Sequence, residues 1–238
     1  GSVPLPTYPF EHGSSSGSSK PVLLEQLLYQ VAWEPCQTEP LNEPLAGNWI
    51  IFDDESPLSV ELRKQLESVG GRCNTVTAGG QWSNSGDGQF QINPTDPEHY
   101  DRLLRSIRSA DGAPITGVVH LWGNLNERAE PGSLNSLDDT LQTSLGSLFH
   151  LAQALGRSRQ VEDRRLLVVT RGAQAVSLGE GPRAEIAPLV SLAQTLPQEL
   201  KGLRVRAVDL EPNAETSAEA KVLRDELQTT TGDVEVAW

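Results

Sequence analysis

Side chains that could supply a proton or a nucleophile are present, but their spacing matches no catalytic motif. An acid/base tyrosine needs a lysine or asparagine four residues later on the same helix, where a lysine can depress the pKa of the phenol. At that spacing Tyr8 is followed by His12, Tyr29 by Trp33 and Tyr100 by Leu104. The sequence contains no GxSxG nucleophile elbow, and Ser144 and Ser147 fall within a predicted buried helix. These residues therefore predict no active site.

The four histidines offer no metal site, because none forms an HExxH motif or a pair spaced i, i+4 (His12, His99, His120 and His150). His120 is the most interesting, since it lies toward the carboxyl end of a predicted buried strand, where open α/β sheets bind ligands. Trp122 and Gly123 beside it could form the wall of a pocket. No carboxylate or nucleophile is close in sequence, so we expect a hydrogen-bonded structural histidine; catalysis by His120 and Trp122 is the alternative.

A dinucleotide site needs glycines directly after the first strand, so that the backbone can approach the pyrophosphate. The first predicted core strand instead runs into Asp53, Asp54 and Glu55, and no glycine occurs between Gly47 and Gly70. Three carboxylates would repel a phosphate, whereas acids at a helix N-terminus stabilise the helix dipole. We therefore expect a strand-to-helix turn without a cofactor. The other glycine-rich stretches are predicted to be a surface loop with Trp82 (residues 79–88) and turns (Gly172 and residues 179–182).

Composition excludes several classes of protein. The 238 residues include 19 Lys and Arg against 32 Asp and Glu, a net charge of −13, which argues against binding to nucleic acid. No apolar run reaches the 18 or more residues of a membrane span, and no signal peptide is recognisable. Cys36 and Cys73 are far apart and not in CxxC spacing, so a reducing, cytoplasmic setting fits best. The chain contains no methionine, even at position 1, so we expect a piece of a longer protein.

Apolar runs alternate with amphipathic segments, which is typical of a parallel sheet with helices on both faces. The predicted strands are Asn48–Asp53, Arg72–Thr77, Thr116–Leu121, Arg165–Thr170 and Leu203–Leu210, bracketed by the strand-like segments Leu27–Trp33 and Val234–Trp238. Four stripes at helical spacing are Leu58, Leu62, Leu66 and Val69; Tyr100, Leu103, Leu104 and Ile107; Leu141, Leu145, Leu148, Phe149 and Ala152; and Ile186, Leu189, Val190 and Ala193. Asp96 is a predicted helix cap before Pro97. The pattern predicts an α/β, Rossmann-like, doubly wound and mostly parallel sheet.

The predicted organisation has three parts. Residues 1–12 are an apolar, proline-rich leader, residues 13–20 are a flexible Gly/Ser linker, and residues 21–238 form the Rossmann-like domain. Toward its end the acidic residues Glu211, Glu215, Glu219, Asp225 and Glu226 are expected to form a solvent-exposed helix face.

Taken together, several motifs resemble one family. The leader Leu5–Glu11 (LPTYPFE) resembles the linker that follows an acyltransferase domain in modular type I polyketide synthases. The body resembles the amino-terminal, structural half of a ketoreductase region of such a synthase, through LLYQVAWEP (27–35), GNWIIFDD (47–54), GVVHLWGNL (117–125), LLVVTRGAQAV (166–176), LRVRAVDLE (203–211) and the terminal VEVAW. Order and spacing match along nearly the whole chain, apart from the Gly/Ser linker.

The resemblance implies a truncated short-chain-dehydrogenase-like fold without activity of its own. In that family a catalytic half binds NADPH and reduces the β-keto group of a carrier-bound chain, and the structural half has lost its cofactor and catalytic residues. Thr170 stands where the superfamily offers a catalytic serine, but no tyrosine follows Tyr100. Residues 120–123 (HLWG) replace the Asn-Asn-Ala-Gly turn. We therefore expect no catalytic, cofactor-binding or metal-binding residues, with NADPH bound only by a half absent from this chain.

The expected partners are a catalytic ketoreductase subdomain and neighbouring synthase domains, with no nucleic acid and no membrane. Residues 192–200 (LAQTLPQEL) match the family's GL-x-R...E-P stretch only loosely. Two alternatives to a supporting half therefore stay open. One is a pseudo-ketoreductase that serves as a docking scaffold in a methyltransferase-containing module; the other is a divergent short-chain-dehydrogenase-like reductase that uses His120 and Trp122.

Overall fold

The computed structural model describes residues 33–35, 43–111, 113–124, 134–158, 164–176, 182–212, 214–229 and 234–238. The chain divides into two units, Gly1–Glu34 and Pro35–Trp238. Of the first unit, Trp33 and Glu34 are described, and they have no regular secondary structure. The predicted leader, the Gly/Ser linker and all but the last residue of the predicted strand Leu27–Trp33 lie outside the described residues, as does Cys36.

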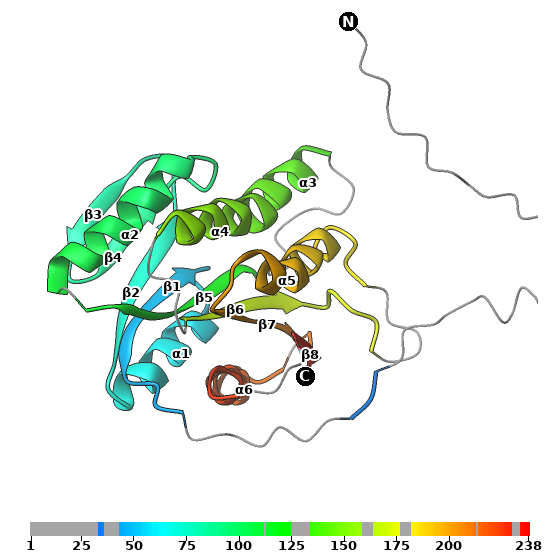
Figure 1. Cartoon of the computed structure of the whole chain (residues 1–238). Coiled ribbons are helices and arrows are strands. Elements are labelled where there is room, and N and C mark those ends of the chain that lie inside the picture. Colours follow the sequence, from blue (N-terminus) through cyan, green and yellow to red (C-terminus); the bar gives the residue numbers. More distant parts are fainter. Residues whose placement is uncertain are drawn as a thin grey trace, which may run out of the picture. The chain divides into compact units, whose positions relative to one another are not determined.

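An eight-stranded sheet forms the centre of the second unit (Figure 1). Its order is β3-β4-β2-β1-β5-β6-β7-β8, and every neighbouring pair is parallel except β3 and β4. The strands are β1 (Gly47–Asp53), β2 (Gly71–Ala78), β3 (Ser83–Gly86), β4 (Gln89–Ile92), β5 (Ile115–Gly123), β6 (Arg164–Arg171), β7 (Leu203–Leu210) and β8 (Glu235–Ala237). The predicted doubly wound, mostly parallel fold is therefore confirmed.

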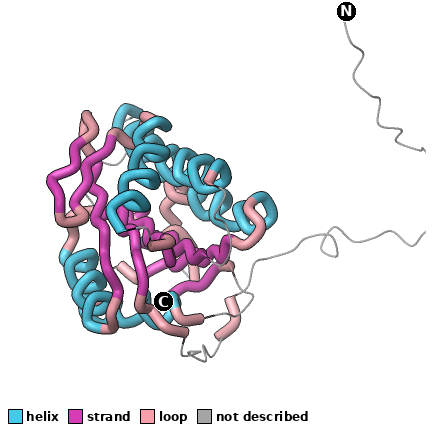
Figure 2. Tube along the Cα trace, turned by 60° about the vertical axis from the view of Figure 1, so that its left-hand side comes forward, coloured by secondary structure: helices cyan, strands magenta, loops and turns pink. Residues whose placement is uncertain are grey.

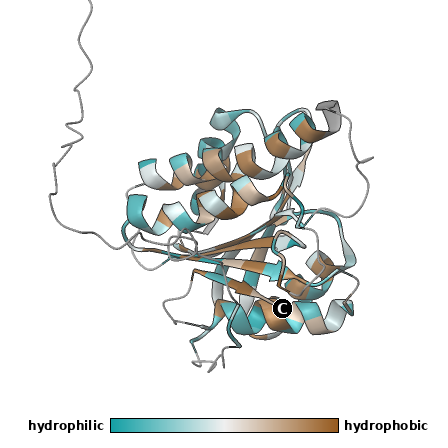
Figure 3. Ribbon diagram, turned by 90° about the vertical axis from the view of Figure 1, so that its right-hand side faces the viewer, coloured by the Kyte–Doolittle hydropathy of each residue, from teal (hydrophilic) through white to brown (hydrophobic). Residues whose placement is uncertain are grey.

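Helices cover both faces of the sheet, as Figure 2 shows with helices in cyan and strands in magenta. One face carries α1 (Pro57–Ser68) and α6 (Thr216–Leu227), and the other carries α2 (Pro97–Asp111), α4 (Ser147–Arg157) and α5 (Ala187–Glu199). Helix α3 (Leu134–Leu141) continues into α4 through a π-helical turn, η2 (Gln142–Gly146). The helices carry alternating hydrophobic and hydrophilic bands in Figure 3, as amphipathic helices that cover a sheet should.

Two hydrophobic cores lie on the two faces of the sheet, and strand alternation assigns residues to them. In β1, Ile50 and Phe52 pack on the α2–α4–α5 side, whereas Trp49 and Ile51 pack on the α1–α6 side. All four side chains are fully buried. The unbroken apolar runs of the sequence thus reflect strands that are covered on both faces.

The helix starts follow local sequence signals. Ser56 caps α1 by accepting a hydrogen bond from the Ser59 backbone N–H at 3.3 Å, and Pro57 takes the first helical position. Asp96 accepts a hydrogen bond from the Glu98 N–H at 2.9 Å, which confirms its predicted role as a cap before α2. No helix in the described part of the chain is long and apolar enough to cross a bilayer.

The prediction of a surface loop at residues 79–88 was wrong in part, because this segment contains strand β3 and the turn of a β-hairpin. Strand β3 pairs antiparallel with β4, and β4 adds to β2 in parallel. The turn between them places Asp87 at φ +50° and the glycines beside it at φ +82° and +75°, all in the left-handed region. Trp82 is half-buried against the core and stacks under the Arg102 guanidinium, 4.5 Å from the ring centre. The hairpin was not predicted because its first strand, β3, is polar and exposed, and only β4 places apolar side chains, Phe90 and Ile92, in the core.

Candidate functional site

The place to look for a ligand is the carboxyl edge of the sheet between β1 and β5. Strand β1 is flanked by β2 on one side and β5 on the other, so the chain winds away from it in both directions. Open α/β sheets bind ligands at such a switch point, in the crevice outside the carboxyl ends of the strands. At this edge lie the turn that follows Asp53 and the end of β5 at Gly123 and Asn124.

The turn after β1 is folded by its own carboxylates. Asp53 Oδ1 accepts a hydrogen bond from the Glu55 N–H at 2.7 Å, and Asp54 Oδ1 accepts from the Ser56 N–H at 3.2 Å and from the Ser56 hydroxyl at 2.6 Å. Glu55 has φ +59°, a left-handed conformation that is unusual for a residue with a side chain. The predicted strand-to-helix turn is present, but its three acids precede the cap Ser56 and do not lie in the first turn of α1. They shape the turn more than they offset the helix dipole.

A polar network crosses the crevice from β1 to α6. Asn124 Nδ2 donates to Asp54 Oδ2 at 2.8 Å, and Asn124 Oδ1 accepts from Arg171 Nε at 2.9 Å. Arg171 Nη1 then donates to Glu219 Oε1 at 2.6 Å and to the Glu211 carbonyl at 2.7 Å. The amide of Asn124 has one orientation that satisfies an acceptor on one side and a donor on the other. The network joins the ends of β1, β5 and β6 to α6 through this chain's own side chains.

Asp54 is the partly buried carboxylate end of this network. Burial raises the pKa of its carboxyl above the usual value, while the hydrogen bonds from Ser56 and Asn124 act in the opposite direction and the nearby Asp53 charge adds to the rise. An ionised carboxylate at this position disfavours an incoming phosphate group, which also carries negative charge.

Trp122 lies beneath the network, and its position differs from the prediction. Its indole N–H donates to the Asp53 carbonyl at 2.9 Å, and its ring meets Phe52 edge to face with centroids 5.0 Å apart. The side chain is only 3% exposed. We predicted a possible pocket wall; the ring instead packs inside the core, because the alternation of β5 turns it toward the α2–α4 face.

Thr170 is buried and engaged in a second cluster at the end of β6. Its hydroxyl donates to Asp209 Oδ1 at 2.8 Å. The same Asp209 carboxylate also accepts hydrogen bonds from the backbone N–H groups of Ala173 at 2.9 Å and Gln174 at 3.0 Å. Consecutive backbone N–H groups of this kind form an anion-binding nest. Asp209 fills the nest, so the carboxylate and the loop after β6 hold each other in place.

His120 is fully buried among aromatic rings, and its hydrogen bond defines its tautomer. Its Nε2 lies 2.7 Å from Ser147 Oγ, and that hydroxyl donates its single proton to the Ser144 carbonyl at 2.8 Å. The imidazole must therefore donate from Nε2. Its Nδ1, the acceptor nitrogen of this tautomer, has no hydrogen-bond partner in the described part of the chain.

Burial also keeps His120 neutral. Removal from water disfavours the charged imidazolium and lowers the pKa of His120 to about 3. Ser144 and Ser147 are both fully buried, as predicted, and they lie in and next to the π-helical turn η2, which contacts β5. With no exposed ring atom, His120 has no access to a bound substrate in this structure.

The acidic face predicted on the last helix is wrong for two residues. Glu219 and Glu226 are only 5% and 3% exposed, since they face the sheet and pair with Arg171 and Arg206. Glu226 also accepts a hydrogen bond from the Trp238 indole at 2.9 Å. The sequence of α6 could have predicted this burial, because Glu219 and Glu226 are seven residues apart and lie on the same helix face as the buried Leu223. A second indication is that their partners, Arg171 and Arg206, occur on otherwise apolar strands.

Sequence reasoning missed Asn124 and Arg171, the two side chains that close the crevice. Neither belongs to a motif with chemical meaning, so their roles become visible only when β5 and β6 are placed side by side. Among the described residues, no group of three or more His, Cys, Asp or Glu side chains is arranged to hold a metal ion.

Comparison with known proteins gives one family and a fold. The family model described as beta-ketoacyl synthase-like, N-terminal matches residues 47–228. Comparison with curated proteins yields no match. The chain is similar to a solved structure titled "Adenylation, ketoreductase, and pseudo Asub multidomain structure of a keto acid-selecting NRPS module", with 22% identity and a TM-score of 0.80 over 88% of this chain and 17% of that chain.

Two further structures share the fold. An N-terminal ketoreductase from the macrolactin assembly line has 18% identity and a TM-score of 0.66, over 85% of this chain and 40% of that chain. A short-chain dehydrogenase/reductase family oxidoreductase from Brucella ovis, in complex with a partially ordered NAD, has 16% identity and a TM-score of 0.59, over 81% of this chain and 99% of that chain.

The chain spans less than half the length of the first two of these structures. The TM-scores show a shared short-chain-dehydrogenase-like fold. The family match adds sequence support to that fold, so the resemblance to a ketoreductase region of a polyketide synthase, which the motifs predict, is confirmed. The chain belongs to the beta-ketoacyl synthase-like, N-terminal family, which its model matches over more than half of the sequence.

Proposed function

We propose that this chain is a non-catalytic, structural domain of a cytoplasmic polyketide synthase. In this proposal it supports an NADPH-dependent β-ketoacyl reductase half that is not part of the chain, and it contacts that half and neighbouring synthase domains. The chain itself binds no cofactor and carries no catalytic residue.

One observation carries the proposal: the strand ends at the switch point are bridged by the chain's own side chains. Asp54 and Asn124 bridge β1 to β5 at 2.8 Å, and Arg171 extends the bridge to α6. A dinucleotide bound there would have to break these hydrogen bonds and approach a carboxylate in place of a glycine-rich backbone. The cost of leaving such buried polar groups without partners is about 1–3 kcal/mol for each group.

The reductase alternative, which uses His120 and Trp122, is disfavoured by the same structure. A general acid or base must come within hydrogen-bond reach of the substrate proton. His120 is fully buried with its Nε2 bound to Ser147, and Trp122 donates to Asp53 inside the core.

Calorimetric titration of the full chain with NADPH and with NADP⁺ tests the proposal. We expect no binding up to millimolar cofactor, with circular dichroism used to confirm that the protein is folded. Binding in the micromolar range would overturn it. A second assay measures NADPH-dependent reduction of a simple ketone; turnover that disappears in His120→Ala would establish the reductase alternative. The docking-scaffold alternative gives the same negative titration and differs in its partner, which pull-down of the adjacent synthase domains identifies.

A further inference from the structure

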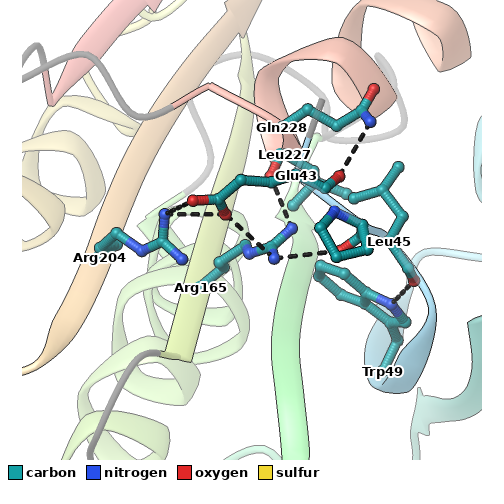
Figure 4. Close-up of polar contacts among 8 residues, drawn as sticks. Glu43, Leu45, Trp49, Arg165, Arg204, Leu227 and Gln228 are labelled. Carbon is teal, nitrogen blue, oxygen red and sulfur yellow. Dashed lines mark hydrogen bonds and ion pairs between the residues drawn. The ribbon is translucent and has the colours of Figure 1, made fainter. Parts of the chain in front are cut away.

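The chain enters β1 through a short strap, residues 43–46, at the amino edge of the sheet (Figure 4). The Glu43 carboxylate accepts two hydrogen bonds from Arg204 Nη1, both at 3.0 Å, and pairs with Arg165 Nη2 at 3.1 Å. Arg165 and Arg204 stand at the beginnings of β6 and β7. A single carboxylate therefore bridges two neighbouring strands of the sheet.

The backbone of the strap, like the Glu43 side chain, is hydrogen-bonded to the rest of the domain. Carbonyl groups of three consecutive residues each accept a hydrogen bond from a side chain of the folded domain: Glu43 from Gln228 Nε2 at 3.0 Å, Pro44 from Arg165 Nη2 at 3.2 Å and Leu45 from Trp49 Nε1 at 2.7 Å. Leu45 is also buried in the core on the α1–α6 side. Three carbonyl groups of the strap are thus paired although the strap is not part of the sheet.

Arg165 connects the strap to the end of α6. Its Nη1 donates to the carbonyl of Leu227 at 3.1 Å, while its Nη2 contacts Glu43 and Pro44. The last carbonyls of a helix have no partner within the helix, and a cation is favourable at that end. Gln228, the residue that follows, reaches back to the Glu43 carbonyl. Arg165 therefore contacts both the strap and the last turn of α6, and Gln228 joins the two directly.

We propose that the strap is a latch that couples the entry of the chain into the domain to the end of α6. Opening of the strap and loosening of α6 at Leu227 are coupled, because the Arg165 guanidinium contacts both, while Arg204 adds a further contact to Glu43. The chain continues from α6 to the edge strand β8. Opening of the strap is thereby transmitted to α6, which leads into the last strand of the sheet, β8.

Hydrogen–deuterium exchange of the full chain tests the latch through reciprocity, since a coupling between two sites must act equally in both directions. Glu43→Gln weakens the strap end, and Gln228→Ala weakens the helix end. We expect each variant to accelerate exchange in both segments, 43–47 and 225–229, by about fivefold, the equivalent of about 1 kcal/mol. Glu61→Gln is the matched control, because Glu61 pairs with Lys64 on the surface of α1 at 3.8 Å.

The location of the change decides the outcome. Acceleration in both segments, with α2 unchanged as an internal reference for intact folding, supports the latch. If Glu43→Gln accelerates exchange in 43–47 alone, or Gln228→Ala accelerates it in 225–229 alone, the two ends are independent and the proposal is overturned. Acceleration throughout the domain identifies a general loss of stability and also contradicts a local latch.

Discussion

Charged side chains form hydrogen-bond networks at both ends of the parallel strands: at the carboxyl edge, where the strands end, and at the amino edge, where they begin. The two networks differ in how deeply their side chains are buried. At the carboxyl edge, Asn124 and Glu219 are 2% and 5% exposed, and Arg171 joins them. At the amino edge, the side chains of Glu43 and Arg204 are 29% and 34% exposed, although Arg165 is as buried as Arg171. The hydrogen-bond distances are similar. The comparison shows that burial, more than the number of contacts, decides what each network contributes.

The difference follows from the cost of removing charge from water. A buried ion pair contributes little net stability over an apolar pair, but removal of one partner leaves an uncompensated buried charge. A partly exposed pair regains water when its partner is removed, so its loss is cheap. The carboxyl edge is therefore the sensitive edge of the domain, and the amino edge is suited to reversible opening.

The largest expected effect is at Arg171. Arg171→Met keeps an unbranched apolar stem but leaves Glu219 buried without its cation and Asn124 Oδ1 without its donor. We expect a loss of about 3–5 kcal/mol in the free energy of unfolding, measured by urea denaturation. The control is Arg183→Met, whose pair with Glu185 is 26% and 33% exposed and whose loss should cost less than about 1 kcal/mol. Equal effects at the two sites would remove the distinction between buried and exposed pairs.

Much of the fold could be predicted because its signals are local. The apolar run at residues 116–121 identifies β5, and Asp96 with Pro97 marks the start of α2 within one residue. The strand β7 has the predicted bounds, Leu203–Leu210. Burial on both faces requires such continuous apolar stretches, so the pattern and the structure share one cause.

The site could be predicted only in part, because its contacts join residues far apart in the sequence. Asp54 and Asn124 are 70 residues apart, and Arg171 and Glu219 are 48 apart. Charge alone suggested that Glu219 faces solvent, and it faces a guanidinium in the interior. The lack of glycine after Asp53 predicted a strand-to-helix turn without a dinucleotide motif. The role of the Asn124 amide, by contrast, has no sequence signature.

A pH experiment separates the buried interior from the exposed edge. The folded-state pKa of His120 is about 3, below the ordinary value of 6.5, so between these values the unfolded chain holds one more proton than the folded chain. Stability therefore rises with pH across this window and is lost as the pH falls. We expect His120 to account for about 2 kcal/mol between pH 6 and pH 4, since one proton gives at most about 1.4 kcal/mol per pH unit.

The measurement is the free energy of unfolding against pH for the wild-type chain and for His120→Asn, which cannot titrate. The wild-type slope between pH 4 and pH 6 should exceed that of the variant, whatever the stability of the variant at neutral pH. Parallel slopes would mean that His120 binds a proton equally in both states, contrary to its burial against Ser147.

The smallest effect is expected at the amino edge. Arg204→Gln removes both hydrogen bonds from Arg204 to Glu43 while Arg165 continues to pair with that carboxylate. Because Arg204 is about one-third exposed, solvent screens the interaction, and we expect a loss of about 0.5–1 kcal/mol in the free energy of unfolding. High salt should reduce the difference from wild type, since at 1 M ionic strength the Debye length falls to about 3 Å. A salt-independent loss above about 2 kcal/mol would place this pair in the same class as the buried one at Arg171. An edge that loses so little when one arginine is removed can open and close without unfolding the domain, as a latch on the entering chain requires.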